Sequence, residues 1–322
     1  MRRREVLAGA VGLFVPVAVA AQEPGRTYRI GVVSPNARSL ETIRDLTLPE
    51  LARLGFEEGH NLVLDLRDAS ENSVQGIVED VIRARPDVIV AITNRMAGYV
   101  QRATNVIPII MYGGDDPVAR GLAASFARPG GNATGITIMS VSLDAKRLEI
   151  IQEAAPSARR IAVLAFATDP NRQDSERRMR VVSAAAGVEL TIVLVSKPDE
   201  FPAAFAQMRQ AGAQALAITA QSSFFAETPF LVRLASEAGL PTICEWREMA
   251  ELGCLLSYGP SRKLLFARVA DYAARILRGA NPGELPIEQP STFEFVVNVG
   301  AAKALGLTIP PTLLARADEV IE

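Results

Sequence analysis

Polar and aromatic side chains recur where short apolar runs of this sequence end, and they are its best candidates for chemistry. In the first half of the chain they are Ser34, Asn36, Thr93, Asn94, Arg95, Tyr112, Asp115, Asp116 and Thr137. In the second half they are Phe166, Gln221, Ser222, Glu245, Trp246, Ser257 and Tyr258. Because their types are mixed and few are nucleophiles or strong bases, they favour binding of a small molecule over catalysis.

The mixture suits a small molecule that carries opposite charges and a flat side chain. Arg95 can hold a carboxylate with paired hydrogen bonds, and helix N-termini after Asn94 and Asp116 attract the same group. Asp115, Asp116 or Glu245 could hold an ammonium group. Flat rings can stack on the aromatic candidates: Tyr112, Phe166, Trp246 and Tyr258. For each single residue an ordinary role in a turn or in the core is an equally good interpretation, and Asp116 before Pro117 also suits a helix cap.

Catalytic and metal-binding patterns are absent from the sequence. There is no GxSxG, HExxH, GxxxxGK[ST] or GxGxxG motif. The only histidine, His60, falls in a polar turn, and a zinc site needs more His and Cys than the chain has. We therefore expect no catalytic residue, no metal site and no cofactor. An enzyme that uses the adjacent carboxylates Asp115 and Asp116 remains an alternative.

The bulk charge and the N-terminus indicate an exported protein. The net charge is −2, with 34 basic and 36 acidic residues, so we expect neither nucleic-acid binding nor attraction to an anionic membrane surface. Arginines at 2–4, an apolar stretch at 6–20 and small residues at Ala20 and Ala21 predict a signal peptide over 1–21. The Sec and Tat export routes both fit. We expect a periplasmic monomer without stable membrane insertion after cleavage.

The two cysteines, Cys244 and Cys254, leave two interpretations open. An oxidising compartment permits a disulfide between them, and both are expected at ends of neighbouring strands. Two buried apolar thiols are the favoured interpretation.

Strand-like and helix-like segments alternate along the whole chain, which predicts parallel α/β sheets flanked by helices. Strands are expected at 28–34, 62–66, 87–92, 107–112, 160–166, 189–195, 215–219, 241–244, 254–258 and 293–298. Helices are expected at 39–55 (interrupted near Pro49), 72–85, 94–104, 117–126, 142–155, 172–186, 199–211, 225–238, 262–278 and 301–305. Parallel strands end at one edge of a sheet, so the candidate residues gather there.

Four segments resemble a known family. They are residues 116–137 (DPVARGLAASFARPGGNATGIT), 146–164, 249–260 and 285–322. They resemble extracytoplasmic solute-binding proteins of ABC transporters related to the tryptophan/tyrosine-type binding proteins. The resemblance implies amino-acid ligands, aromatic ones among them, an ABC permease and ATPase as partners, and no enzymatic activity. A sensor that presents its closed form to a membrane receptor is the alternative.

The same resemblance implies a two-lobed, periplasmic-binding-protein-like (type I) α/β fold that closes by a hinge over a cleft between the lobes. Residues 27–138 and about 260–284 would form lobe 1, and 139–259 with about 285–322 would form lobe 2. The chain would cross between lobes near 135–142, 258–262 and 283–291.

Overall fold

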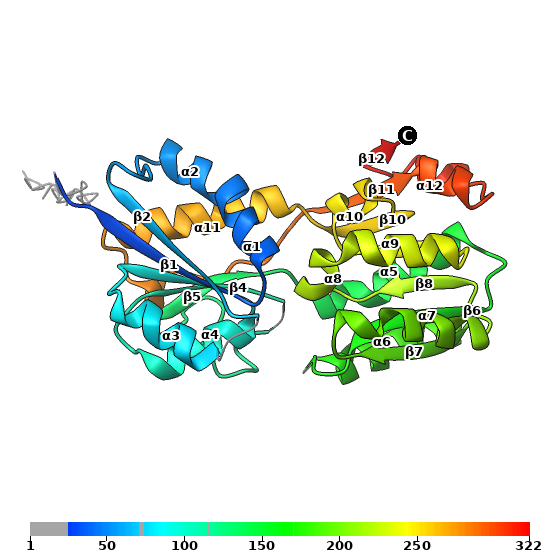
Figure 1. Ribbon diagram of the computed structural model, residues 1–322, viewed down its shortest axis with the longest axis horizontal. Helices are drawn as coiled ribbons and strands as arrows, with labels where there is room; N and C mark the ends of the chain where they lie inside the picture. Colours follow the sequence, from blue (N-terminus) through cyan, green and yellow to red (C-terminus); the bar gives the residue numbers. More distant parts are fainter. Residues whose placement is uncertain (1–24, 71–73, 115, 170) are drawn as a thin grey trace, which may run out of the picture.

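The computed structural model of the protein describes residues 25–70, 74–114, 116–169 and 171–322, and it forms two α/β lobes side by side (Figure 1). The expected fold, two sheets flanked by helices, is confirmed. The predicted signal peptide, 1–21, and the candidate residue Asp115 lie outside the described residues.

The first lobe contains a parallel sheet of five strands in the order β2-β1-β3-β4-β5. Its strands are β1 (Tyr28–Ser34), β2 (Leu62–Asp68), β3 (Val88–Ile92), β4 (Ile109–Gly113) and β5 (Ala133–Thr137). Its helices are α1 (Ala37–Thr42), α2 (Leu48–Arg53), α3 (Val74–Arg83), α4 (Asn94–Ala103) and α11 (Arg262–Leu277). Successive strand residues point to opposite faces, so Val88 and Val90 enter the core beside α11, while Ile89 and Ala91 pack with α3 and α4.

The second lobe contains a sheet in the order β12-β11-β10-β9-β8-β6-β7. Its strands are β6 (Arg160–Phe166), β7 (Glu189–Val195), β8 (Ala215–Ile218), β9 (Thr242–Cys244), β10 (Leu256–Pro260), β11 (Phe293–Asn298) and β12 (Glu319–Ile321). Its helices are α5 (Ser140–Ala154), α6 (Arg172–Ala185), α7 (Phe201–Gln210), α8 (Ser222–Ala226), α9 (Thr228–Glu237), α10 (Arg247–Glu251), α12 (Val299–Ala304) and α13 (Pro311–Leu314). A short 3₁₀ turn lies at Pro198–Glu200 in this lobe, and another lies at Pro282–Glu284 in lobe 1. The pairs are parallel except β10 with β11. This exception differs from the expected parallel arrangement, because the chain returns from lobe 1 into β11.

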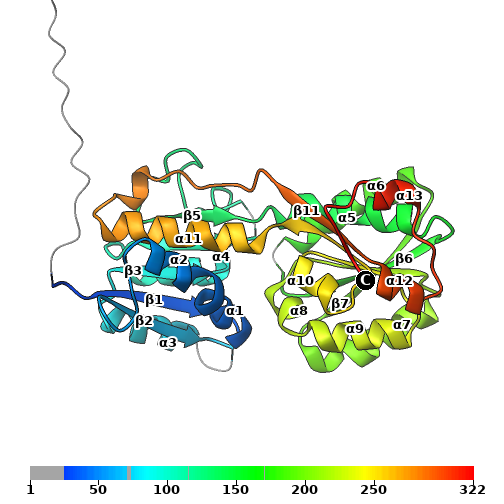
Figure 2. The same cartoon turned by 90° about the horizontal axis from the view of Figure 1, so that it is seen from above.

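The described chain passes between the sheets after β5, after β10 and before β11 (Figure 2). Met139, between β5 and α5, has a left-handed backbone with φ 55°. In the third passage Glu288 still pairs with Ile136 of β5, and the Leu285 carbonyl accepts a hydrogen bond from Thr134 Oγ1. Residues 285–288 thus lie on lobe 1, slightly beyond the limit expected from sequence.

The expected helix at 117–126 is wrong, because the chain makes only turns there. Asp116 Oδ1 accepts hydrogen bonds from the N–H groups of Val118 and Ala119, and Leu122 N–H donates to the Pro117 carbonyl. Gly121 then adopts a φ of +70°, which ends the helical turn. Asp116 therefore caps a turn, and the segment does not aim a helix into the lobe interface.

The interruption expected near Pro49 is a π-helical turn, Ile43–Thr47, between α1 and α2. Proline has no N–H to donate to the carbonyl four residues before it. The wider turn, in which Leu48 N–H donates to the Ile43 carbonyl, brings the chain past this position without breaking the helix axis.

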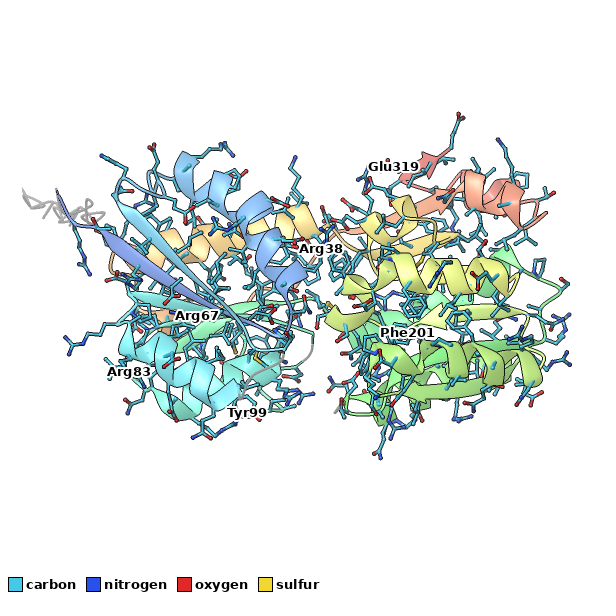
Figure 3. The ribbon with its side chains drawn as sticks, viewed as in Figure 1. Arg38, Arg67, Arg83, Tyr99, Phe201 and Glu319 are labelled. Carbon is cyan, nitrogen blue, oxygen red and sulfur yellow. A yellow bond between two sulfur atoms is a disulfide. The ribbon has the colours of Figure 1, made fainter. Side chains whose placement is uncertain are left out.

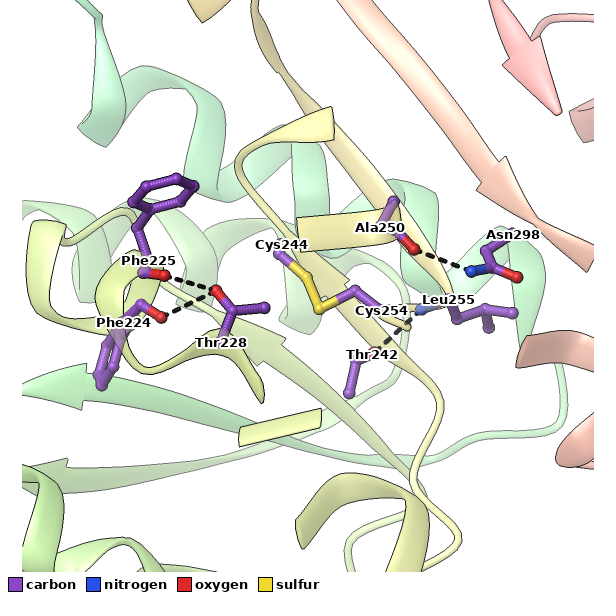
Figure 4. Close-up of a disulfide and its surroundings, with 9 residues drawn as sticks. All are labelled: Phe224, Phe225, Thr228, Thr242, Cys244, Ala250, Cys254, Leu255 and Asn298. Carbon is purple, nitrogen blue, oxygen red and sulfur yellow. Dashed lines mark hydrogen bonds between the residues drawn. A yellow bond between two sulfur atoms is a disulfide. The ribbon is translucent and has the colours of Figure 1, made fainter. Parts of the chain in front are cut away.

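The two cysteines form a disulfide, so the favoured interpretation of free buried thiols is wrong (Figure 4). Cys244 ends β9, and Cys254 precedes β10, its parallel neighbour. Because adjacent parallel strands end at the same edge, α10 must return the chain along the sheet before β10 begins, and this return brings the two side chains together.

Candidate ligand-binding site

A cavity of about 520 Å³ is lined by residues from both lobes. Its lining includes these candidates from the sequence: Thr93, Asn94, Arg95, Tyr112, Phe166, Gln221, Ser222, Glu245 and Trp246. Each follows or ends a strand, so the carboxyl edges of the two sheets face each other here. Figure 3 shows Arg38 of α1 at the edge of lobe 1, and its guanidinium carbon lies 5.9 Å from the ring centroid of Phe225 in lobe 2.

The wall in lobe 1 is built on a strained turn between β3 and α4. Thr93 has φ 87°, which is rare for a β-branched residue and is concentrated at functional sites. Its N–H donates to the Tyr112 carbonyl at 2.7 Å, and its hydroxyl accepts a hydrogen bond from Met96 N–H at 3.3 Å. Asn94 packs against Gly113, where a Cβ would come within 1.6 Å of Asn94 Oδ1, so this wall requires glycine at 113.

Aromatic rings surround one arginine at the base of the cavity. The ring of Tyr112 stacks on Phe266 with centroids 4.5 Å apart. The guanidinium carbon of Arg262 lies 3.8 Å from the centroid of Phe225 and 5.7 Å from that of Trp246. Because α11 belongs to lobe 1 whereas Phe225 and Trp246 belong to lobe 2, these contacts join the lobes at the base of the cavity.

Arg262 was not among the candidates, yet its environment is distinctive. It is 8% exposed, donates a hydrogen bond to Thr42 Oγ1 at 2.7 Å and lies 3.4 Å from Glu248 Oε1. Burial raises the pKa of Tyr112 far above its ordinary value, and the nearby Arg262 cation opposes that rise. The sequence carries one signal for Arg262: a cation at the first position of a helix is disfavoured by the helix dipole, so a special role is expected there.

The wall in lobe 2 is a hydrogen-bonded chain of polar side chains. Asp169 Oδ2 accepts from Gln221 Nε2 at 2.6 Å, and its Oδ1 accepts from Asn171 N–H at 2.9 Å. Asn171 Oδ1 in turn accepts from Arg120 of lobe 1 at 2.5 Å. Arg120 and Asn171 were not predicted, because Arg120 lay in a segment interpreted as a surface helix. Their contact connects the two lobes at the rim of the cavity.

A buried arginine, Arg147, lies beside Glu245 and compensates its negative charge. Glu245 is 3% exposed, and its Oε1 lies 3.5 Å from Arg147 Nη2. Arg147, 1% exposed, also donates to Asp144 Oδ1 at 2.6 Å and to the Tyr258 carbonyl at 2.8 Å. Glu245 therefore already has a counter-ion, which weakens its case as a partner for a ligand ammonium group.

Several candidates do not line this cavity. Ser34 is buried and donates to the Asn36 carbonyl, while Asn36 caps α1 by accepting from Ser39 N–H. Ser257 is fully buried, and the ring of Tyr258 stacks on Phe293 instead. Asp116 and Thr137 line a neighbouring cavity of about 590 Å³.

The described part of the chain contains neither a metal-binding cluster nor a membrane-spanning helix. No group of three or more His, Cys, Asp or Glu side chains lies close enough together there to hold a metal ion. No helix in the same ranges has the length and apolar character needed to cross a bilayer.

The fold and the cavity are those of a two-lobed α/β protein of the periplasmic-binding-protein-like class. The chain belongs to the family of ABC transporter substrate binding proteins, whose sequence profile matches residues 31–321. This confirms the resemblance seen in the sequence, and it places the chain among solute-binding proteins rather than enzymes.

Named relatives agree with the family assignment. The chain is 25% identical over 271 residues to the tyrosine-binding protein of Clostridioides difficile (strain R20291), covering 84% of this chain and 78% of that protein. A conserved domain protein from Vibrio cholerae O1 superposes with a TM-score of 0.83 at 26% identity, covering 92% of this chain and all of the other. An "ABC domain in complex with L-Trp from Streptococcus pneumonia" superposes at 0.81 with 24% identity and the same coverage.

Proposed function

We propose that this protein is the periplasmic solute-binding component of an ABC importer. It binds a small organic solute, an amino acid or an aromatic carboxylate, between its lobes and delivers it to a permease and ATPase. The observation that carries the proposal is the cavity of about 520 Å³ lined by the strand ends of both sheets, because closing two such edges would enclose a small molecule.

The chemistry of the lining supports a ligand of this kind. Arginines suit a carboxylate, and the rings of Tyr112, Phe166 and Trp246 suit a flat apolar group. The names of two relatives, a tyrosine-binding protein and a domain in complex with L-Trp, support ligands of the same class.

The chain connections support a hinge mechanism. The passages after β5, after β10 and before β11 lie close together in the middle of the molecule (Figure 2). Rotation about these three segments would open the cavity without disturbing either sheet, and the ligand would favour the closed population. Residues 27–138 with about 260–288 would move as one lobe, and the remainder as the other.

Export completes the proposed role. Residues 1–21 would be removed as a signal peptide near Ala20 and Ala21, releasing the mature protein into the periplasm. Mass spectrometry of the periplasmic fraction tests this step, since retention of the intact N-terminus would contradict it.

Binding is tested with the purified mature protein and a thermal-shift panel of amino acids and small aromatic acids, followed by calorimetry. A ligand at a hundredfold excess over its dissociation constant adds about 2.7 kcal/mol to the free energy of unfolding. A non-fluorescent ligand should also change the emission of Trp246, the only tryptophan, because it lines the cavity. Uptake of the labelled ligand should fall in cells lacking the gene. Binding with unchanged uptake would favour a sensor, and no binding of any solute would contradict the proposal.

A further inference from the structure

Two buried hydrogen-bond donors lie side by side at the base of the cavity. Tyr112 is 8% exposed, and its hydroxyl has no hydrogen-bond partner among the described residues. Both groups lie against the same ring, because the Tyr112 and Phe266 centroids are 4.5 Å apart and the Arg262 guanidinium carbon is 5.7 Å from the Phe266 centroid. The phenol oxygen can accept a hydrogen bond from the guanidinium, but the phenol O–H finds no acceptor on Arg262, because arginine has donors only. A ligand that supplies acceptor atoms here would satisfy both groups.

The acceptor that fits two adjacent donors, one of them cationic, is a carboxylate. Its two oxygens can take the phenol O–H and a guanidinium N–H together, and such charge-assisted bonds are stronger than neutral ones. Glu248 Oε1 lies 3.4 Å from Arg262 and its side chain is partly exposed, so it compensates the positive charge of Arg262 only in part. A neutral carbonyl or hydroxyl oxygen on the ligand would not supply the missing negative charge.

The surroundings of this pair are flat and apolar. Phe225 and Trp246 lie on the guanidinium from lobe 2, and Phe266 stacks on Tyr112 from lobe 1. Phe166 adds a further ring to the lining. A planar unsaturated group beside the carboxylate would therefore contact aromatic surfaces on two sides.

The protein already engages the two described carboxylates of the lining, Asp169 and Glu245. Both oxygens of Asp169 accept hydrogen bonds from the protein, and Glu245 Oε1 lies 3.5 Å from Arg147 Nη2. A ligand ammonium group would compete with these existing contacts at either carboxylate. The described lining therefore favours a ligand that carries a carboxylate without an amine.

We propose that the ligand is a planar aromatic carboxylate whose carboxylate binds between the Tyr112 hydroxyl and the Arg262 guanidinium, and that an α-amino group is not required. This proposal rests on the proposed function and narrows its ligand class. Because Arg262 contacts both lobes, the same bond also favours the closed arrangement of the lobes.

The test is calorimetry of the mature protein with compounds that share a ring and differ in their charged groups. The panel is L-tyrosine, 3-(4-hydroxyphenyl)propionate and tyramine, with L-tryptophan, indole-3-propionate and tryptamine as the second series. We expect the amine-free acids to bind at least as tightly as the amino acids, and the amines to bind about a hundredfold more weakly or not at all.

Two variants locate the carboxylate. Arg262→Gln should weaken binding of the acids by about ten- to a hundredfold, and Tyr112→Phe, which preserves the ring and the packing, by about three- to tenfold. The control is Arg275→Gln, a change in the same helix at a residue that does not line the cavity and should leave affinity unchanged. Thermal unfolding without ligand verifies that each variant folds.

The outcomes separate this proposal from the broader one. Tight binding of the amines, loss of binding when the amine is removed, or full affinity in Tyr112→Phe would overturn the carboxylate assignment. Binding of a non-aromatic solute alone would overturn it too and leave the importer role intact. If no member of either panel binds, the carboxylate assignment fails, and the wider thermal-shift panel then decides whether the protein binds any solute.

Discussion

At the scale of single residues, Arg147 connects several parts of lobe 2 that approach the cavity. It lies in α5, just after the first passage between lobes, and donates to the Tyr258 carbonyl just before the second. It is also the counter-ion of Asp144, which in turn accepts from Ser175 Oγ of α6 at 2.5 Å, and of Glu245 in the cavity wall. Burial raises the pKa of Asp144, and the Arg147 charge opposes that rise. Arg147 thus connects the chain beside two of the passages between the lobes with one wall of the cavity.

We expect Arg147→Met to lower the free energy of unfolding by about 3–5 kcal/mol, because two carboxylates would stay buried without their counter-ion. Urea denaturation measures this loss. The matched control is Arg316→Met, which removes the exposed ion pair with Glu153 and should cost less than about 1 kcal/mol. Equal effects in the two variants would contradict the structural role of Arg147.

At the scale of elements, the disulfide closes a short loop that carries one wall of the cavity. The loop from Cys244 to Cys254 contains Glu245, Trp246 and α10. Its far end is held by hydrogen bonds from Leu255 N–H to Thr242 Oγ1 and from Asn298 Nδ2 to the Ala250 carbonyl (Figure 4). The covalent bond therefore restricts the segment that presents Trp246.

Reduction of the disulfide, or the double variant Cys244→Ala/Cys254→Ala, should lower the free energy of unfolding by about 2–3 kcal/mol, as expected for a loop of this size. Urea denaturation with and without a phosphine reductant measures it. The double variant is the control for side effects of the reductant, since its own unfolding should not respond. An unchanged wild-type curve after verified reduction would refute the stabilising role.

A second connection between elements joins α11 to the segment before β11. Arg268 donates two hydrogen bonds to Glu288, Nη2 to Oε1 at 2.5 Å and Nε to Oε2 at 2.8 Å. These hydrogen bonds hold the pKa of Glu288 below its ordinary value. A carboxyl group with a lowered folded-state pKa stabilises the protein above its unfolded-state pKa, and this stabilisation is lost as the pH falls through the folded-state value.

We therefore expect stability to decline as the pH falls below about 4.3, the ordinary pKa of a glutamate. Glu288→Gln should be less stable than wild type at pH 7 and should lose less stability on acidification. Thermal unfolding between pH 7 and pH 3 measures both effects. Glu153→Gln, at an exposed ion pair, is the control, and an identical acid response in all three proteins would rule out the Glu288 contribution.

At the scale of the whole molecule, direct contacts hold the lobes together at the rim and the base of the cavity. Arg120 donates to Asn171 at the rim, and Arg262 contacts Phe225, Trp246 and Glu248 at the base. In the proposed hinge mechanism these contacts would form only in the closed arrangement, so they would favour the closed population and slow ligand release.

Asn171→Ala should speed ligand dissociation about two- to tenfold, because the closed form loses one cross-lobe hydrogen bond worth about 0.5–1.5 kcal/mol. Stopped-flow displacement of bound ligand measures the rate. Unfolding of the ligand-free protein should change little, because Asn171 makes no side-chain cap on α6. Asn105→Ala, an exposed residue before β4, is the control. An unchanged dissociation rate in Asn171→Ala would show that the rim contact does not retain the ligand.

The class of fold follows from the amino-acid sequence alone. Short apolar runs predicted most of the strands, because burial on both faces of a sheet leaves a continuous apolar run. The strands β5 and β12 were not predicted. The sequence also predicted candidates such as Thr93, Arg95, Gln221 and Trp246 on the cavity lining, since parallel strands must end on one edge. Whether these residues bind the ligand is a prediction that the experiments above address.

Other features depend on how the elements pack in three dimensions. The spacing of apolar residues favoured a helix at 117–126, but Asp116 and Gly121 turn the chain there. The spacing of apolar residues carries no information on such turns. The disulfide, the partner of Glu245 and the contacts of Arg262 all join residues that sequence distance does not relate, such as Arg262 and Thr42. Contacts of this kind depend on how whole helices and strands pack. The pattern of apolar residues in a sequence shows which face of an element is buried, but it does not show which other element packs against that face.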